Sequence, residues 1–359
     1  MLRIQDRRIR IALAIVLLAV IGVALYQVGR NAWADWHYRR AREALDQFDY
    51  AQATAYLKRS LDLRGTDPET LLLAAQTARR QGSFAEANRL LAKAHKHGAP
   101  PEALDLEQRL LQIQSGDLSD AGGLIHLCQD RPDSPEALLP LEAIIEGSLK
   151  SKTPPLAFWG ADLWLKHYPG ALNQAQGYYW RARAHQDAGD FPRARADFLQ
   201  ALEAAPDHYL ARLWLATFLV EKEPHEAAVH IDWLRQKRPN ELAVRFQSAR
   251  LQRNLGRPED AAVLLDQILA SAPENPAIVP ALVERGRVEM DLNRPGEAEH
   301  WIRRALEITP WQREVNLALA DCLLRAGRND DAKKYQKIVQ EIDVQNAKMK
   351  AEREKQTGK

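Results

Sequence analysis

The segment HEAAVH, residues 225–230, is the part of this sequence closest to a catalytic metal site. A metalloprotease helix carries two histidines four residues apart, so that both rings lie on one face and bind one zinc ion. His225 and His230 are five residues apart, and at about 100° per residue their side chains diverge by about 140°. We therefore expect no metal site here. The sequence also has no phosphate-binding glycine loop and no G-x-S-x-G motif, so we expect no catalytic residue and no cofactor.

Arginines that directly follow a small residue offer a different chemistry, the binding of carboxylates. These arginines are Arg42, Arg183, Arg250 and Arg287. Tyr38, Tyr179 and Phe246 precede three of them by one helical turn, and Arg253 follows Arg250 by about one turn. Guanidinium groups bind carboxylates through paired hydrogen bonds and stack on aromatic rings. This pattern favours a surface that grips an acidic peptide or a chain terminus, although solvent-facing helix positions also often carry arginine.

The composition is that of a folded protein without a strongly basic body. Of the 359 residues, 46% are hydrophobic and 27% are charged, and the net charge is +2. Arginines among the first ten residues supply this excess, so the remainder of the chain is close to neutral. A nucleic-acid-binding protein usually has a basic body, so we expect no nucleic-acid partner. Cys128 and Cys322 lie in apolar helical patterns far apart in the sequence, which predicts two buried thiols.

Residues 11–29 predict a membrane-spanning helix. No charged residue interrupts IALAIVLLAVIGVALYQVG, and as a helix it would span about 28 Å, close to the hydrocarbon thickness of a bilayer. A cleaved signal peptide is the alternative, because Ala32-Trp33-Ala34 has the small-x-small form of a cleavage site. The long apolar core, followed by Arg30 and a large Trp, favours an uncleaved anchor. Trp33, Trp36 and Tyr38 follow the span and would suit the membrane interface.

The flanking charges predict the orientation of this span. Four arginines precede it and Arg30 follows it immediately, which places the N-terminus in the cytoplasm and the remainder of the chain on the periplasmic or extracytoplasmic side. Arg39, Arg40 and Arg42 follow within about fifteen residues and weaken this asymmetry. We therefore expect a single-pass membrane protein that contacts the lipid bilayer through residues 11–29.

Alanines recur through the rest of the chain at intervals of 33 to 37 residues. The set is Ala53, Ala87, Ala121, Ala157, Ala194, Ala227, Ala261, Ala298 and Ala332. Five residues before them, Gly or Asn recurs where a left-handed helix end is needed. The residues at this place are Gly82, Gly116, Gly189, Gly256, Asn293 and Gly327. Twelve residues after many of the alanines comes a proline, which suits the start of the next helix. Each interval therefore predicts two helices joined by a tight turn.

Further small residues predict that these helices pack closely. A small residue recurs seven places after several of the alanines, as at Ala94 and Ala201, and a bulky residue such as Phe198 lies between. Twelve places before them, another small residue recurs in the first helix of each pair, as at Ala75 and Ala320. Small residues allow two helices to approach at the short end of the range of 8–10 Å between their axes.

This arrangement resembles the tetratricopeptide repeat family, whose units are 34 residues long, and the resemblance covers about residues 34–345. It implies an all-α fold: a right-handed superhelical solenoid of helical hairpins, here preceded by one transmembrane helix. We expect a basic arm at 1–10, the span at 11–29, nine repeats at 30–345 and a polar C-terminal helix end at 346–359. Units three, four and six are divergent, because Arg109, Ile145 and Leu215 replace the small residue of the first helix.

The resemblance also implies a function, namely the binding of other proteins or peptides in a concave groove lined by the first helices. In this interpretation the groove-facing residues are Arg42, Tyr179, Arg183, Phe246, Arg250, Arg253 and Arg287, and acidic segments are the expected ligands. We expect a bacterial scaffold without a small-molecule substrate. The alternatives are a structural component of a larger envelope machine, of the polysaccharide export or cytochrome maturation type, and a periplasmic repeat protein with a cleaved signal.

Overall fold

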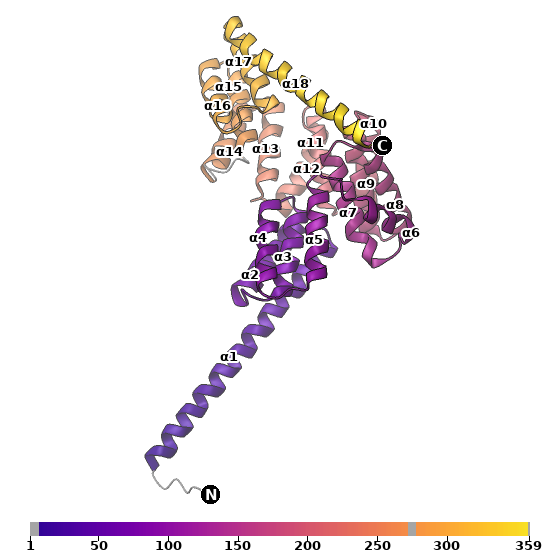
Figure 1. Cartoon of the computed structure of the whole chain (residues 1–359). Coiled ribbons are helices and arrows are strands. Elements are labelled where there is room, and N and C mark those ends of the chain that lie inside the picture. Colours follow the sequence, from indigo (N-terminus) through magenta and orange to yellow (C-terminus); the bar gives the residue numbers. More distant parts are fainter. Residues whose placement is uncertain (1–6, 272–277, 358–359) are drawn as a thin grey trace. The chain divides into compact units, whose positions relative to one another are not determined.

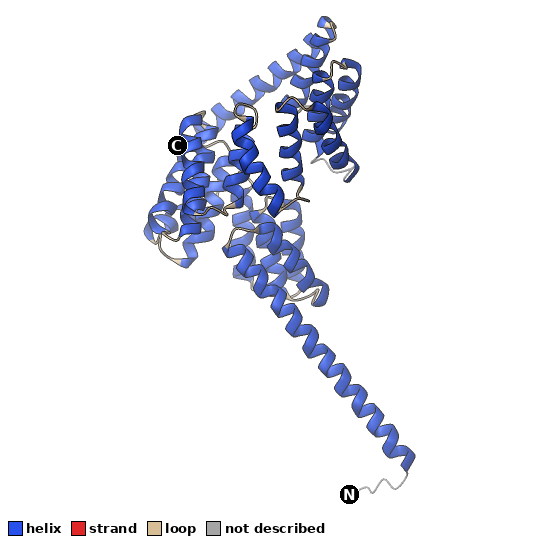
Figure 2. Cartoon of the chain, turned by 180° about the vertical axis from the view of Figure 1, so that it is seen from behind, coloured by secondary structure: helices blue, strands red, loops and turns tan. Residues whose placement is uncertain are grey.

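The computed structural model describes residues 7–271 and 278–357, and within these ranges the chain forms eighteen α-helices and no β-strand (Figure 2). The expected all-α hairpin solenoid is confirmed. Successive helices form hairpins 1 to 9, each with a first and a second helix. In hairpin 3 the two helices, Pro101–Gln114 and Gly122–Asp130, both pack on the helix Pro135–Lys150 rather than mainly on each other. Two parts of the sequence prediction lie outside the described residues. They are residues 1–6 of the basic arm and Pro273, the proline twelve residues after Ala261. The chain divides into two compact units, unit 1 up to His208 and unit 2 from Tyr209.

Unit 1 contains hairpins 1 to 5. Their helices are α1 (Arg7–Asp46) with α2 (Tyr50–Leu63), α3 (Pro68–Arg80) with α4 (Phe84–Lys96), α5 (Pro101–Gln114) with α6 (Gly122–Asp130), α7 (Pro135–Lys150) with α8 (Pro154–His167), and α9 (Ala171–Asp187) with α10 (Phe191–Ala204). Unit 2 contains hairpins 6 to 9. Their helices are α11 (Tyr209–Leu219) with α12 (Pro224–Lys237), α13 (Leu242–Asn254) with α14 (Pro258–Ser271), α15 (Val279–Asp291) with α16 (Pro295–Ile308), and α17 (Arg313–Arg325) with α18 (Asn329–Thr357).

The first helix, α1, is 40 residues long and combines the expected span with the first helix of hairpin 1. Figure 1 shows it running without a break from Arg7 into the hairpin. The large apolar side chains between Leu13 and Val28 are all 45–68% exposed. Further along the same helix, Ala34 and Ala41 are completely buried. One helix therefore has a bare apolar half and a packed half.

The nine recurring alanines are all at most 1% exposed, which confirms that they mark packed helix contacts. Gly286 shows how close the helices come: a Cβ at this residue of α15 would lie 2.5 Å from Cγ1 of Ile302 in α16. Methyl groups are the largest side chains that most of these positions accept, and the bulky residues between them fill the adjoining space. The shallow faces predicted from the sequence are therefore the interhelical contacts of the solenoid.

The turns within the hairpins confirm the expected left-handed helix ends. The five glycines at this place have φ between 75° and 106°, and Asn293 has φ 58°. Phe48 in hairpin 1 and Lys152 in hairpin 4 stand at the same place with φ 55° and 57°. Side chains other than glycine and asparagine rarely adopt this conformation, so surrounding contacts must hold these two residues.

Hairpin 4 is packed by an exchange of large and small residues between its helices. Ile145 replaces the usual small residue of the first helix and is completely buried. Opposite it stands Gly160 of α8, where a Cβ would lie 2.5 Å from Cγ1 of Ile145. The second helix therefore supplies the small surface in this hairpin.

Hairpin 3 also departs from the common pattern. Its second helix, α6, has only nine residues, and Arg109 of α5, which replaces the usual small residue, pairs with Asp120 across 3.2 Å.

Cys128 and Cys322 are free, buried thiols, as expected. Burial raises the pKa of the Cys128 thiol to about 12, and burial, with smaller contributions from nearby charges, raises that of Cys322 to about 11. Both remain protonated near neutral pH and pack as small apolar side chains.

Candidate partner-binding surface

The first helices of successive hairpins contact one another in a row, which in unit 1 consists of α3, α5, α7 and α9. We call the side chains along this row the inner surface. In unit 2 the row is α11, α13, α15 and α17. It carries four of the predicted binding residues, and two of these, Arg253 and Arg287, meet at one carboxylate. Arg253 of α13 donates from Nε to Oε1 of Glu284 across 2.6 Å, and Arg287 of α15 donates to Oε2 of the same carboxylate across 3.2 Å. Arg253 also donates to Asp291 across 3.2 Å. One glutamate therefore holds two arginines.

The side chains of this network differ in their exposure to solvent, from a buried acid to a half-exposed arginine. The Glu284 side chain is 1% exposed, Arg253 is 16% exposed and Arg287 is 45% exposed. Burial lowers the pKa of Arg253, but the Glu284 and Asp291 carboxylates outweigh this effect, and the pKa is raised overall. Both carboxylate oxygens of Glu284 are used, so this buried acid fixes the direction of both guanidinium groups. Arg287 carries five N–H donors at the exposed end of the network.

Arg250 and Phe246 lie next along α13. The Arg250 guanidinium lies 6.0 Å from the centre of the Phe246 ring and donates to Gln247 across 3.0 Å. It also pairs with Glu221, whose side chain is 56% exposed. The Phe246 ring and the Arg250 guanidinium thus lie together, one turn apart on α13. Acidic residues of the same chain also pair with Arg250 and Arg253, and the sequence pattern alone does not indicate these ion pairs.

Unit 1 holds the other predicted residues in a more enclosed setting. Tyr179 of α9 is 3% exposed, and Arg183 donates to its hydroxyl oxygen across 3.0 Å. Trp180 donates to Glu146 of α7 across 2.7 Å, and burial raises the pKa of Glu146. These side chains are largely internal, so a partner could reach Tyr179 only after the unit opened.

The turn of hairpin 1, residues 47–50, occupies the inner surface of unit 1. Phe48 is 9% exposed, and its ring centre lies 6.4 Å from that of Trp164 and 6.3 Å from that of His208. Next to it, the Tyr50 hydroxyl donates to Oε1 of Glu142 across 3.2 Å. These contacts join residues 92 to 160 positions apart. Periodicity describes neighbouring repeats only, so the sequence pattern does not reveal these distant contacts.

Arg80 and Glu142 form the charged centre of this internal cluster. Arg80 of α3 donates from Nε to Oε1 of Glu142 across 2.7 Å, and the two side chains are 8% and 2% exposed. The guanidinium also lies 4.8 Å from the centre of the Tyr50 ring. Burial lowers the pKa of Arg80, but Glu142 and Tyr50 outweigh burial, so the pKa is raised overall. The pair is shielded from water.

Arg42, the remaining predicted residue, lies apart from both clusters. It is exposed on the packed half of α1, one turn after the half-buried Tyr38. Burial raises the pKa of the Tyr38 hydroxyl, and the Arg42 charge opposes this shift. The two residues are neighbours, as the sequence predicted.

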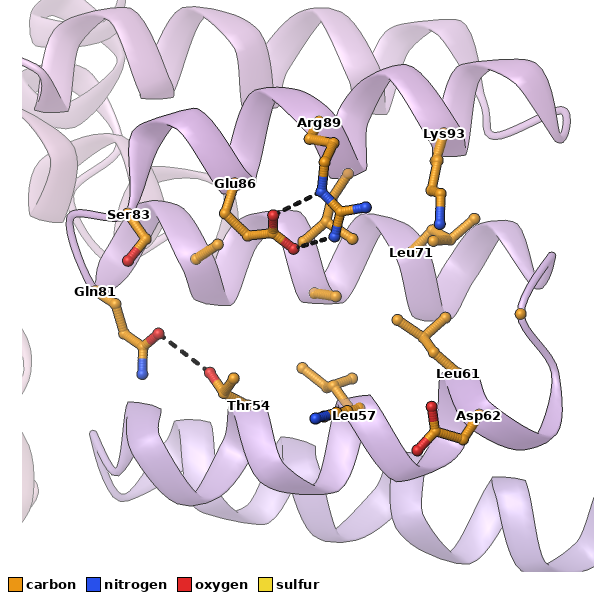
Figure 3. A pocket seen from close by; sticks show the side chains of 15 residues that line it. Thr54, Leu57, Leu61, Asp62, Leu71, Gln81, Ser83, Glu86, Arg89 and Lys93 are labelled. Atoms are coloured by element: carbon orange, nitrogen blue, oxygen red, sulfur yellow. Dashed lines mark hydrogen bonds and ion pairs between the residues drawn. The ribbon is translucent and has the colours of Figure 1, made fainter. Parts of the chain in front are cut away.

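Two clefts lie on the other side of the hairpins, between successive second helices. The cleft between α2 and α4 has a volume of about 490 Å³, and Figure 3 shows the α3 helix as its floor. Leu57, Leu61 and Leu71 line it, and Glu86 pairs with Arg89 at its edge. The second cleft, of about 710 Å³, lies between α12 and α14 over α13 and contains Arg235 and Arg245.

The histidines of HEAAVH lie on α12 without a metal-binding partner set. His225 is exposed, whereas a ring nitrogen of His230 lies 3.3 Å from Arg212. Burial and the Arg212 charge lower the pKa of His230. In the part of the chain that the structure describes, no group of three or more His, Cys, Asp or Glu side chains is arranged to hold a metal ion.

Comparisons with known proteins find repeats of one family in the chain. Models described as tetratricopeptide repeat match residues 179–241 and 246–312, and a second such model matches residues 289–351. The matched regions contain Arg183 and all the arginines of the unit 2 network. A comparison with curated proteins found no match.

Several solved structures are similar to this chain. A tetratricopeptide repeat protein from Parabacteroides merdae is 14% identical, with 81% of this chain and 99% of that chain covered and a TM-score of 0.45. Yeast Tom70 is 12% identical, with 89% of each chain covered and a TM-score of 0.41. IFIT1 with Gppp-AAAA is 18% identical, with 76% of this chain and 69% of that chain covered and a TM-score of 0.50. At such identities, likeness shows the fold alone.

Proposed function

Because this chain is a tetratricopeptide repeat protein, we propose that it is a membrane-anchored scaffold that binds acidic segments of other proteins on the inner surface of unit 2. Repeats of this kind are protein-interaction scaffolds in general, and the fold itself specifies no partner. The observation that carries the proposal is the graded arginine network around Glu284. The proposed role involves no catalytic step, no cofactor and no small-molecule substrate.

Membrane anchoring is supported by the bare half of α1. This part of the helix has a mean hydropathy of 2.0, and none of it is buried by the rest of the chain. A solvent-exposed apolar helix of this length would be unfavourable in water, whereas a bilayer removes its surface from water. The most direct test is extraction of membranes with alkaline carbonate, in which an anchored protein stays in the pellet.

Cleavage at Ala34 is less consistent with the packing of hairpin 1. Ala34 is completely buried, and its carbonyl oxygen accepts a hydrogen bond from Ser60 Oγ across 3.1 Å. A cut there would remove the start of a packed helix, so we infer that the span stays attached. N-terminal sequencing of protein purified from membranes distinguishes the two forms.

We further propose that the repeats lie outside the cytoplasm, because the arginines before the span outnumber those directly after it. A C-terminal fusion to alkaline phosphatase should be active, and the matching fusion to a fluorescent protein that matures only in the cytoplasm should be dark. The opposite pattern would place the repeats in the cytoplasm and would leave the arginine proposal untouched.

The proposed mode of binding depends on which of the carboxylates paired with these arginines a partner's carboxylate can replace. Glu284 is buried and keeps Arg253 and Arg287 in place, whereas Glu221 is 56% exposed and Asp291 is 37% exposed. An incoming acidic side chain can take the place of either exposed acid without disturbing the buried one. Exposed ion pairs contribute little to stability, so their replacement costs little. The internal acids would thus hold the arginines in a binding geometry until a partner arrives.

A triple substitution tests this surface. Arg250→Ala, Arg253→Ala and Arg287→Ala together should abolish capture of cross-linked partners from detergent-solubilised membranes, as read by mass spectrometry. The matched control replaces three arginines of second helices, Arg89, Arg193 and Arg235, whose side chains are 57–74% exposed. This control should capture as the unaltered protein does. Equal capture by both variants would contradict the role of the inner surface.

Assembly through the outer helices is the second candidate, because two apolar side chains are exposed there. Val229 of α12 is 67% exposed, and Val263, at the equivalent place of α14, is 58% exposed. These helices also border the cleft of about 710 Å³. A component of a larger envelope machine would pack on this face. Photo-cross-linkers at Val229 and Val263 would then capture partners while the triple arginine variant kept its partners.

A further inference from the structure

The junction between the span and the first hairpin contains no linker. α1 continues through it as one helix, and hairpin 1 is already closed at Ala34, where Ser60 of α2 donates to the backbone. Arg64, just after α2, pairs with Asp35 at the same level. The hairpin therefore begins five residues after Gly29, the last residue of the expected span.

This spacing places the base of hairpin 1 close to the bilayer. Five helical residues rise about 7.5 Å. The interfacial layer on each side of the hydrocarbon core is about 5–8 Å thick. If residues 11–29 fill the core, the lower ends of α1 and α2 lie within the headgroup layer or directly on it. A flexible linker would relax this constraint, but the helix is continuous.

The side chains at this level suit an interface between lipid and water. Trp33 is 54% exposed and stacks on Trp36, with ring centres 5.0 Å apart and planes 5° apart. The Arg40 guanidinium lies 5.3 Å from the Trp36 ring centre on the side away from the span. Indole rings concentrate at membrane interfaces, because one part of the ring system is apolar and the N–H is polar.

Charged groups complete the same surface. Arg30 follows the span, and Arg59 of α2 is exposed and close enough to His37 to lower the pKa of that imidazole, after the larger effect of burial. The acids near this level include Asp35, Asp62 and Asp67; Asp35 is paired with Arg64, and Asp67 caps the start of α3 by accepting from Thr70 N. Arginine binds phosphate oxygens through paired hydrogen bonds. The surface therefore offers indoles to the glycerol region and guanidinium groups to lipid phosphates.

We propose that the base of hairpin 1, formed by Trp33, Trp36, Arg30 and Arg59, is seated in the phospholipid headgroup layer and makes the first repeat a lipid-contacting element. This inference rests on the proposed membrane anchoring. The occupant of the surface is the bilayer itself, since the span that continues into this hairpin brings the two together. The first repeat then has a fixed height and tilt relative to the membrane.

Fluorescence quenching in vesicles tests the proposal on the full chain. Trp33→Cys is labelled with a small environment-sensitive fluorophore, and the protein is reconstituted in phosphatidylcholine vesicles that contain nitroxide-labelled lipids. The matched control is Gln52→Cys, an exposed position near the opposite end of α2. We expect the label at residue 33 to be quenched several times more strongly than the label at residue 52. A flexible Gly-Ser insertion between Gly29 and Arg30 should abolish this difference while the protein stays in the vesicles.

The outcomes separate this inference from membrane anchoring. Equal quenching at residues 33 and 52 in protein that floats with the vesicles would overturn the seated first repeat and leave anchoring intact. Protein that does not float with the vesicles would overturn anchoring itself, and the inference with it. Strong quenching that persists after the insertion would show that hairpin 1 binds lipid by its own surface, which supports the lipid contact without the help of the span.

Discussion

The inner surfaces of the two units use the same side-chain chemistry and differ in how deeply it is buried. In unit 1, Arg80 and Glu142 form a pair whose side chains are 8% and 2% exposed beneath the turn of hairpin 1. In unit 2, Glu284 is as deeply buried, but its partner Arg287 is 45% exposed. A closed pair of this kind fixes the fold, whereas a half-open network can exchange acids with a partner. Burial therefore separates a structural arginine from a candidate binding arginine.

The largest expected effect comes from breaking the closed pair. Glu142→Ala should lower the free energy of unfolding by about 3–5 kcal/mol, because the Arg80 charge stays buried without its carboxylate. The matched change in unit 2, Glu221→Ala, should cost less than about 1 kcal/mol, because that acid is largely exposed. Chemical denaturation in detergent measures both values. Similar losses for the two variants would contradict the distinction between the units.

The second prediction concerns Phe48, whose ring packs near Trp164 and His208 in unit 1. Phe48→Ala should cost about 3–5 kcal/mol, because a nearly buried ring leaves a cavity beside Trp164 and His208. It should also increase amide hydrogen exchange along α7 and α9 while exchange in α13 and α15 stays unchanged. Faster exchange in all four helices would mean that the turn does not act on unit 1 alone.

Acid should weaken unit 1 through His208. Burial lowers the pKa of its imidazole to about 4 from the ordinary 6.5, so the folded unit keeps the ring neutral. The unfolded chain binds the proton as pH falls below about 6.5, whereas the folded chain does not. Stability is therefore lost between about pH 6.5 and pH 4, up to about 3 kcal/mol.

The variant His208→Gln isolates this contribution. Denaturation at pH 7.5 and at pH 4.5 should show a smaller acid loss than in the unaltered protein, because glutamine does not titrate. The exposed His97, changed in the same way, is the control and should leave the acid loss unaltered. An unchanged pH dependence in His208→Gln would show that other groups cause the acid loss.

The smallest expected effect concerns the left-handed turns, one in each unit. At Lys152 of unit 1 and Asn293 of unit 2, the glycine variant should be more stable than the alanine variant by about 1 kcal/mol, because alanine is strained at positive φ. In a helix interior the order is the reverse by a similar amount. Thermal unfolding of the four variants measures the difference. Alanine variants as stable as the glycine variants would mean that these turns relax in solution.

The repeats could be predicted because their determinants are local. The buried alanines and the glycines of the turns recur at fixed spacings, so the period alone predicts paired helices joined by tight turns. Phe48 and Lys152 escaped prediction as left-handed residues, since neither residue type favours that conformation and tertiary contacts impose it. The exchange of Ile145 and Gly160 also escaped, because it depends on a pair of positions rather than on either residue alone.

The binding surface could be predicted only in part. Helical spacing placed Arg250 and Phe246 together correctly, and it brought Arg253 and Arg287 to neighbouring helices. It did not reveal that Glu284 lies between the latter two, since that contact depends on the stagger of α13 and α15. Nor did it reveal the enclosure of Tyr179, whose ring centre lies 6.5 Å from that of Phe198 and 6.0 Å from that of His208.

The unbroken α1 also has a mechanical consequence. A continuous helix resists torsion and bending, so the junction between the span and the repeats has no swivel. Rotation of the span about its axis turns hairpin 1 through the same angle, and a load applied to hairpin 1 is passed back to the span as a torque. A domain joined to the helix by a flexible linker could instead turn independently of it.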